Sequence, residues 1–200
     1  MSIRLVLAAF ASCWLAHTAA PQSRPIVYKA AIAALAEDSD VRAEFENGLA
    51  SKARGHDYDA MTTYDIEPDV KKLRGDGFMR ELSSRGVQAV LLLRPAAVGK
   101  GSSLESVRNE VSPRLYGDMQ RFARNVSSTG PDDLIAVVHM AIYLLRGDDD
   151  AELISSGAVW LDEPVEDRAE GIERLQDLVL ANVDAVRPAI RRHLGLPELP

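Results

Sequence analysis

Two long apolar segments in the second half of the chain place the strongest constraint on its fold. Residues 134–145, LIAVVHMAIYLL, and residues 152–161, ELISSGAVWL, flank the sequence GDDD at 147–150. Glycine and aspartate tolerate the backbone angles of tight turns, so this pattern predicts an antiparallel hairpin with a four-residue turn. The first segment is apolar on both faces when it is extended. A strand of this kind needs a covering layer on each side.

Three further strands are predicted in the first hundred residues. Residues 26–35 form an apolar run of strand length, and residues 58–66 alternate between apolar and polar side chains. One solvent-exposed face is typical of an edge strand. Residues 87–94, VQAVLLLR, are almost continuously apolar and are expected to lie at the centre of a sheet.

Helix signals separate these strands. N-cap side chains predict a helix that begins near Asp40 and that Gly55 ends. Pro68 and Asp76 are typical of further helix starts before the third strand. Apolar residues then recur at helical spacing over 164–190, where Pro188 is expected to kink or end the last helix.

The order of these elements predicts an α/β fold. Right-handed crossovers make the first three strands parallel. We therefore expect a five-stranded mixed sheet of order 2-1-3-4-5, with the last hairpin antiparallel and the helices mainly on one face. A single domain over residues 26–195 accounts for the pattern, and residues 99–130 form a polar insert within it.

The first twenty residues predict an export signal that is cleaved. Arg4 precedes an apolar run at 5–16, which is shorter than the roughly 20 residues that span a bilayer. Residues 21–25 then form a short tether. The mature domain is expected outside the cytoplasm, in the periplasm.

Two cleavage sites are compatible with this signal. The sequence FASC at 10–13 resembles a bacterial lipobox, which would make Cys13 a lipidation site. Trp14 follows it, and absence of aspartate there is typical of sorting to the outer membrane. The alternative is ordinary cleavage near the small residues at 18–20. Both alternatives remain open.

Composition excludes two classes of partner. The chain has 23 basic and 30 acidic residues, a net charge of −7, and loss of Arg4 with the signal leaves 22 − 30 = −8. Such a surface repels nucleic acid and anionic lipid headgroups, so we expect neither as a partner and a membrane only through a lipid anchor. Cys13 is the only cysteine, so packing alone must hold the mature domain.

No catalytic, cofactor or metal motif is recognised. The loop VGKGSS at 98–103 lacks the earlier glycine of a phosphate-binding loop, because Arg94 stands in its place. The acidic residues 148–150 with Glu152 lack the spacing of a calcium loop. Three histidines are too scattered to form a zinc site: His56, His139 and His193. We therefore expect no cofactor, no metal and no enzyme activity.

One group of side chains suggests a binding surface. On the strand 134–145, His139 and Tyr143 point to one face, and a four-residue turn places Ile154 and Trp160 on the same side. Residues 102–126 of the insert can pack over this face. Alternatively, part of it is a docking surface for another protein, with His139, Tyr143 and Trp160 as contact residues and Tyr143 and Trp160 as anchors.

Three sequence stretches resemble a family of small bacterial envelope lipoproteins, mostly of unassigned function. They are DVR..FE at 40–46, GVQAVL at 86–91, and the pairing of IYL at 142–144 with GAVW at 157–160. The family shares its α/β domain with the amino-terminal domain of TolB, the curli secretion lipoprotein and the penicillin-binding-protein activator lipoproteins. The resemblance covers roughly residues 26–195.

The resemblance implies an adaptor or assembly protein that performs no chemistry. We therefore expect an exported accessory lipoprotein of the cell envelope that acts by contact with another envelope protein. The alternative is a periplasmic carrier of a small apolar ligand, held in a pocket between the sheet and the insert.

Overall fold

A computed structural model describes most of the predicted domain. The described residues are 28–36, 38–56, 58–74, 76–100, 134–147, 150–161 and 163–197. The predicted signal at 1–20 with Cys13, the tether at 21–25 and residues 101–130 of the insert lie outside this part of the chain.

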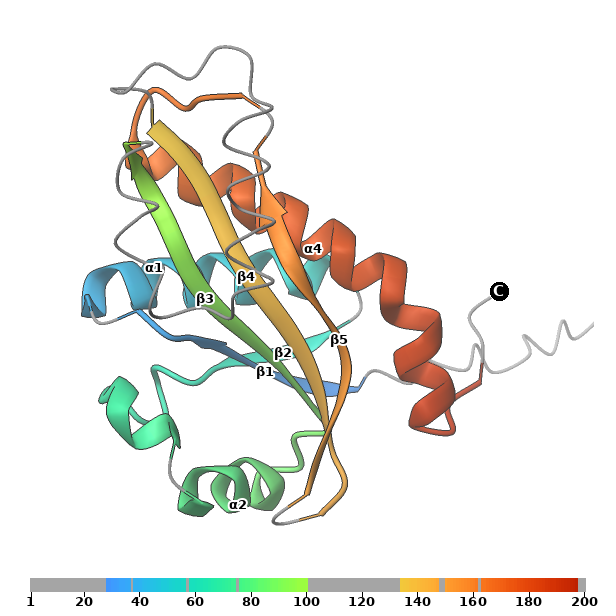
Figure 1. Ribbon diagram of the computed structural model, residues 1–200. Coiled ribbons are helices and arrows are strands. Elements are labelled where there is room, and N and C mark those ends of the chain that lie inside the picture. The colour runs from blue at the N-terminus through green and yellow to red at the C-terminus, as the bar shows by residue number, and fades with distance from the viewer. Residues whose placement is uncertain are drawn as a thin grey trace, which may run out of the picture.

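The five predicted strands form one mixed sheet of order β2-β1-β3-β4-β5 (Figure 1). The strands are β1 (Lys29–Ala34), β2 (Asp59–Thr62), β3 (Ala89–Lys100), β4 (Leu134–Leu145) and β5 (Ala151–Trp160). β1 pairs in parallel with β2 and β3, whereas the β3–β4 and β4–β5 pairs are antiparallel. The predicted strand order and the antiparallel hairpin are confirmed.

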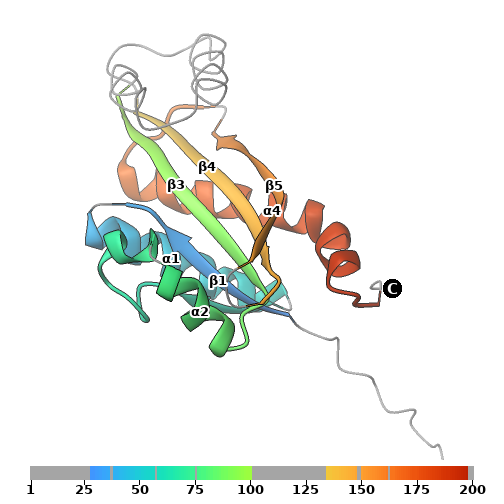
Figure 2. The same cartoon turned by 60° about the horizontal axis from the view of Figure 1, so that its bottom comes forward.

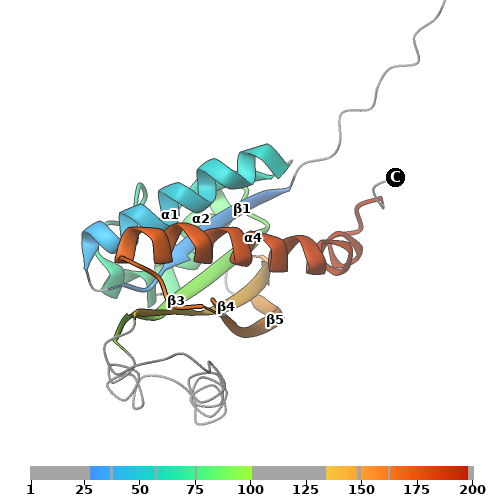
Figure 3. The ribbon, with the colours of Figure 1, turned by 90° about the horizontal axis from the view of Figure 1, so that it is seen from above.

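The two longest helices cover one face of this sheet. The helical elements are α1 (Ser39–Ala53), α2 (Asp76–Ser84), α4 (Arg168–His193) and the short 3-10 turns η1 (Arg54–His56) and η2 (Val70–Arg74). α1 and α4 lie side by side on what we call the inner face (Figure 3). α2 and η2 pack on the opposite, outer face, against β1 and β3 (Figure 2). The predicted concentration of helices on one face is confirmed.

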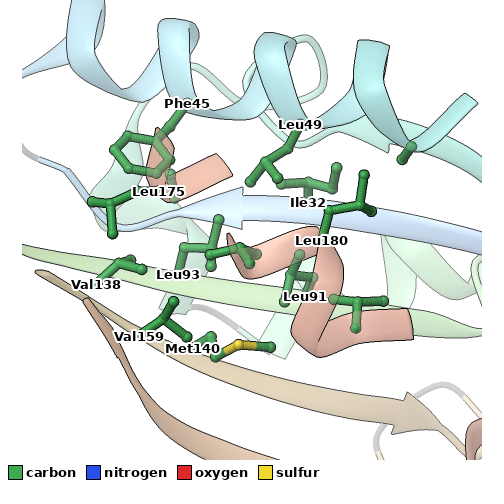
Figure 4. Close-up of a cluster of buried hydrophobic side chains, with 14 of the residues drawn as sticks. Ile32, Phe45, Leu49, Leu91, Leu93, Val138, Met140, Val159, Leu175 and Leu180 are labelled. Carbon is green, nitrogen blue, oxygen red and sulfur yellow. The ribbon is translucent and has the colours of Figure 1, made fainter. Parts of the chain in front are cut away.

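The main hydrophobic core lies between the inner face and these two helices. Phe45 and Leu49 of α1 and Leu175 of α4 point toward the sheet, where they meet Leu93 and Val138 (Figure 4). These five side chains are fully buried. Full burial of a large aliphatic or aromatic side chain contributes about 1.5–3 kcal/mol to folding, so this layer is the main source of stability.

α1 and α4 approach each other closely at a glycine. A Cβ atom on Gly48 would lie only 2.2 Å from the side-chain amide nitrogen of Gln176. That amide is buried and donates a hydrogen bond to the carbonyl oxygen of Glu44 at 3.1 Å. Glycine at position 48 therefore sets how closely the two helices pack.

Two strands have different ends from those predicted. β2 stops at Thr62 and not at Ile66, because the following residues turn back toward α1, where the Tyr64 amide donates to the Glu46 carboxylate at 2.6 Å. β3 continues past Arg94 to Lys100, because it keeps pairing with β4 through an irregularity between Pro95 and Ala97. The first two residues of the predicted insert thus belong to β3.

The last helix also differs at its start. Asp167 is the N-cap, and its carboxylate accepts a hydrogen bond from the Glu170 amide at 2.9 Å, so α4 begins at Arg168 and not at Pro164. Pro188, expected to kink or end the last helix, lies inside α4, which continues to His193, so the second alternative is excluded. In the described part of the chain, no helix combines the length and the apolar character needed to cross a membrane.

A buried ion pair ties α1 to the sheet. Arg42 and Glu46 are fully buried, and their Nε and Oε1 atoms are 2.9 Å apart. The same Glu46 oxygen accepts from the Ala34 amide at the end of β1 and from the Thr63 hydroxyl. Arg42 also donates to the carbonyl oxygen of Pro68 at 2.8 Å. The pair is thus fully hydrogen-bonded, which is the condition for burying two charges without a large loss of stability.

Replacement of Glu46 should be the most damaging single change in this layer. Glu46→Ala leaves the Arg42 charge and the amides of Ala34 and Tyr64 without their partner, so we expect a loss of about 3–5 kcal/mol in the free energy of unfolding, measured by urea denaturation. The control is Glu81→Ala, which removes an exposed pair with Arg85 at the same i,i+4 spacing and should cost about 0.5 kcal/mol or less.

A double variant separates the ion pair from the amide contacts. Arg42→Met with Glu46→Leu should remain less stable than the wild type, because the two backbone amides stay unsatisfied. Full recovery of stability in the double variant would show that Glu46 serves only to neutralise Arg42.

Candidate interaction surface

The predicted contact residues lie on the outer face of β4 and β5. Inner-face residues of β4, among them Val138 and Met140, join the main core, so His139 and Tyr143 point to the opposite side. In the β4–β5 register, Trp160 pairs with Val137, which also points outward. The structure therefore places His139, Tyr143 and Trp160 on one face, as the sequence predicted.

Ile154 does not lie on this face, and that prediction is wrong. Leu145 pairs with Ala151, so the loop is one residue longer than the predicted turn, and Tyr143 pairs with Leu153. An irregularity after Tyr143 restores the expected register at Ile142 and Ser155. The extra residue is Ile154, which packs against the inner core, and Leu153 takes its place on the outer face.

Exposure differs sharply across the outer face. Val137 and Ala141, at its centre, have only 1% and 3% of their surface exposed. His139, Tyr143 and Trp160 are partly buried, whereas Leu153 is 50% exposed. Among the described residues, Leu153 is the one large apolar side chain classed as exposed. The surface open to a partner is therefore the β5 side of this face and not its centre.

His139 has a cationic neighbour on the same face. It pairs across the strands with Arg94 of β3. Burial lowers the pKa of His139 below its ordinary value of 6.5, and the charge of Arg94 lowers it further. His139 is thus neutral at pH 7, so its partial burial on an apolar face removes no charge from water.

An apolar groove lies where α2 packs on the outer face. It has a volume of about 220 Å³ and runs between α2 and the strands, with Phe78 and Met79 on one wall and Leu92 and Tyr143 on the other. An engineered apolar cavity of about 150 Å³ binds benzene, so the groove has room for a small apolar molecule.

A polar cluster that the sequence did not predict lies at the far end of α4. The Tyr58 hydroxyl donates to Asp184 Oδ1 at 2.7 Å and accepts from Arg187 Nε at 2.8 Å. Arg187 also pairs with Asp184, and His56 Nδ1 lies 2.9 Å from the second Asp184 oxygen. Asp184 and Arg187 are visible as an i,i+3 pair, but nothing in the sequence links them to Tyr58.

The pKa shifts in this cluster follow from burial and hydrogen bonding. Burial raises the pKa of Tyr58 far above its ordinary value, and the neighbouring Tyr28 and Asp184 raise it further. Burial also acts to raise the pKa of Asp184, but hydrogen bonds from Arg187 and Tyr58 outweigh it and hold that pKa below 3.8. Asp184 and Arg187 are therefore ionised, and their hydrogen bonds to Tyr58 hold α4 in place.

Tyr28 lies beside this cluster and lines a small internal cavity. Its ring meets the Tyr58 ring edge to face, with centroids 5.2 Å apart. Burial raises the pKa of Tyr28 to about 12, and its buried hydroxyl has no hydrogen-bond partner in the described part of the chain. The cavity has a volume of about 40 Å³, room for a few water molecules at about 10–15 Å³ each and not for an organic ligand.

The described residues contain no cluster of three or more histidine, cysteine, aspartate or glutamate side chains that could hold a metal ion. The acidic residues 148 and 149 lie outside the described part, so the predicted hairpin turn is seen only at its flanks.

Comparison with known proteins shows a weak likeness in fold. No protein-family model matches the chain, and no curated protein matches it. Among solved structures, the fold is similar to that of Lipoprotein GNA1162 from Neisseria meningitidis, with a TM-score of 0.43 and 12% identity over 80% of this chain and 99% of that one. A likeness at this level carries no conclusion about function. The predicted resemblance to the TolB-type envelope lipoproteins stays a prediction.

Removal of the two tyrosine hydroxyls should have opposite consequences. Tyr58→Phe deprives Arg187 and Asp184 of a hydrogen bond, so we expect a loss of about 1–2 kcal/mol in the free energy of unfolding. Tyr28→Phe removes a buried hydroxyl that has no hydrogen-bond partner among the described residues, so the stability of this variant should equal or exceed that of the wild type. Urea denaturation measures both. An equal loss in the two variants would contradict the assignment.

The shift at His139 predicts a dependence of stability on pH. Because the folded-state pKa lies below 6.5, the unfolded chain binds a proton first as the pH falls. The His139 contribution is complete above about pH 6.5 and is lost as the pH falls through the folded-state pKa. Urea denaturation at pH 7.5 and 5.5 should show a smaller decrease for His139→Gln than for the wild type. Equal decreases would contradict the prediction.

Proposed function

We propose that this protein is an exported accessory protein of the bacterial cell envelope that acts by contact with other proteins and performs no catalysis. The observation that carries the proposal is the exposed edge of β5. Within the part of the chain that the structure describes, this ten-residue strand is the last of the sheet, and Leu153 on it is half exposed.

β5 carries features that protect an edge strand only in its first half, where Glu152 is charged and the extra residue Ile154 interrupts the ladder. Natural edges are short, or carry lysine, proline or another charge that prevents pairing with a second chain. The other edge of this sheet, β2, follows that rule, because it has only four residues and begins with exposed Asp59. In β5, residues 153–160 contain no charged side chain and no proline. A strand of this kind is suited to binding another polypeptide.

Aromatic side chains flank this strand on the outer face. Tyr143 pairs with Leu153 near one end of β5, and Trp160 is its last residue. Tyrosine and tryptophan are enriched among the residues that contribute most to protein interfaces. Both are partly buried here, so they support the contact surface as well as bordering it.

The location follows from the predicted export signal. Its cleavage releases the domain into the periplasm, and lipidation of Cys13 would hold it on the outer membrane. More than one acyl chain is needed for stable attachment, which a bacterial lipoprotein anchor supplies. The unidentified partner is therefore another envelope protein.

A charge at position 153 should prevent partner contact without unfolding the domain. Because Leu153 is half exposed, Leu153→Glu should change the free energy of unfolding by less than about 1 kcal/mol. We expect it to reduce crosslinking to envelope proteins at least about fivefold, measured by mass spectrometry after crosslinking in intact cells. Ala181→Glu adds the same charge at an exposed position of α4 and should leave crosslinking unchanged.

Two further variants distinguish a contact role from a core role for the aromatic residues. Tyr143→Ala and Trp160→Ala should weaken crosslinking while the domain stays folded by circular dichroism. Unfolding of both would assign them to the core and leave Leu153 to define the surface. Normal crosslinking in Leu153→Glu would contradict the proposal.

The second candidate is a periplasmic carrier of a small apolar ligand. The observation in its favour is the groove of about 220 Å³ between α2 and the outer face. The internal cavity of about 40 Å³ does not support it, because no organic ligand fits there. We place the carrier second because, among the described residues, Tyr143 is the one side chain lining the groove that carries a polar group, and binding sites for small ligands use several such groups to orient the ligand.

A further inference from the structure

We propose that the apolar groove beneath α2 binds a free fatty acid with an unbranched chain of roughly eight to ten carbon atoms. The inference goes beyond the contact function proposed above, and it holds whether or not the protein acts as a carrier. It also concerns a different part of the surface, because neither Leu153 nor Trp160 is among the described residues that line the groove.

The groove has an enclosed inner part and an open rim. Ala33 of β1, Val90 of β3 and Leu82 of α2 line it and are buried. Phe78 and Met79 of α2 also line it but are only partly buried. A ligand can therefore enter between the partly exposed side chains, and the buried ones remove its apolar surface from water.

The groove is long and narrow. Its lining includes residues from four neighbouring strands, namely Ala33 of β1, Leu92 of β3, Tyr143 of β4 and Ala151 of β5. Neighbouring strands lie about 4.8 Å apart, so the groove crosses about 14 Å of the sheet. A volume of about 220 Å³ over this length leaves an average cross-section of about 16 Å². Because carbon atoms in contact lie about 3.5–4.0 Å apart, this cross-section admits a single file of them.

The volume of the groove sets the length of the chain. A cavity of about 150 Å³ holds the six carbon atoms of benzene, so a groove of about 220 Å³ holds roughly nine carbon atoms. A ring system of that size needs a space that is wider and shorter than this one. An unbranched aliphatic chain matches both the length and the width.

The polarity of the lining fits a ligand with one polar end. Tyr143 is the one described side chain of the lining that carries a polar group. Its hydroxyl can donate a hydrogen bond to a carboxylate. Tyr143 is only partly buried, so a carboxylate beside it stays in contact with water and keeps its charge at little cost. A compact polar ligand would need several such groups, whereas a fatty acid needs one.

A series of fatty acids measures the length of the groove directly. The probes are straight-chain acids of about six to fourteen carbon atoms, titrated below their micelle concentrations into the processed full chain with Cys13→Ser by isothermal titration calorimetry. Affinity should rise about fourfold with each added methylene group, because each one buried leaves water. It should level off at roughly ten carbon atoms, where the chain fills the groove.

A larger side chain at the β5 side of the groove should shorten it. Ala151 lines the groove and is exposed, so Ala151→Phe adds a ring there without overpacking the core. We expect the affinity to level off at a shorter chain, and the affinity for decanoic acid to fall at least about tenfold, as loss of two or more buried methylene groups predicts. Ala181→Phe, at an exposed position of α4, should change neither result.

Removal of the Tyr143 hydroxyl should have a different signature. Tyr143→Phe keeps the ring and removes one hydrogen bond to the carboxylate, so every acid in the series should bind about threefold to tenfold more weakly. The chain length at which affinity levels off should stay the same. A purely structural role of Tyr143 would instead lower the free energy of unfolding or change the dependence on chain length.

Each outcome decides the inference. Absence of binding at every chain length overturns it. An affinity that keeps rising to the longest acid also overturns it, because that result describes adsorption to an open surface. A levelling-off that Ala151→Phe does not move places the ligand elsewhere and has the same consequence. None of these results bears on the contact function, which the Leu153→Glu variant tests separately.

Discussion

The structure depends on one constraint, which is that the central strands β3 and β4 are apolar on both faces and must be covered on both. α1 and α4 cover the inner face over its whole width, and α2 with η2 covers the outer face at β1 and β3. The order of the sheet follows from this arrangement, since the short polar strand β2 lies at one edge. β5 then lies at the other edge of the sheet.

Patterns within short stretches of sequence predicted most of the fold. The apolar runs and the N-cap side chains before Asp40 are local signals, and the strands and the helix that they predict are present, with Asp38 as the N-cap. The errors arise where a contact with a residue far away in the sequence determines the local structure. β2 ends early because Glu46 of α1 binds the Tyr64 amide, and Ile154 turns inward because the β4–β5 ladder contains an extra residue. The Tyr58–Asp184 contact joins residues 126 positions apart, which no local pattern reveals.

The candidate surface was predicted in its residues but not in its extent. Alternation along β4 correctly grouped His139 and Tyr143, because the period of a strand is fixed at two, and the expected pairing of β4 with β5 correctly placed Trp160 on the same face. It did not reveal that Val137 and Ala141 beside them are buried, since burial depends on what packs above a face. The exposed side chain is instead Leu153, which lies on the outer face only because the β4–β5 ladder is irregular. Ionisable groups gather elsewhere, at Asp184 and Arg187, where they hold α4 in place.

The contact between Gly48 and Gln176 has a consequence for how this sequence can change over time. Any side chain at position 48 would collide with the buried amide at position 176, which itself holds the Glu44 carbonyl. Alanine would normally favour a helix at such a site by roughly 0.5–1 kcal/mol, but here that gain is set against displacement of the end of the Gln176 side chain and loss of its hydrogen bond to Glu44. A side chain at position 48 is therefore expected to be accommodated best together with a smaller residue at position 176.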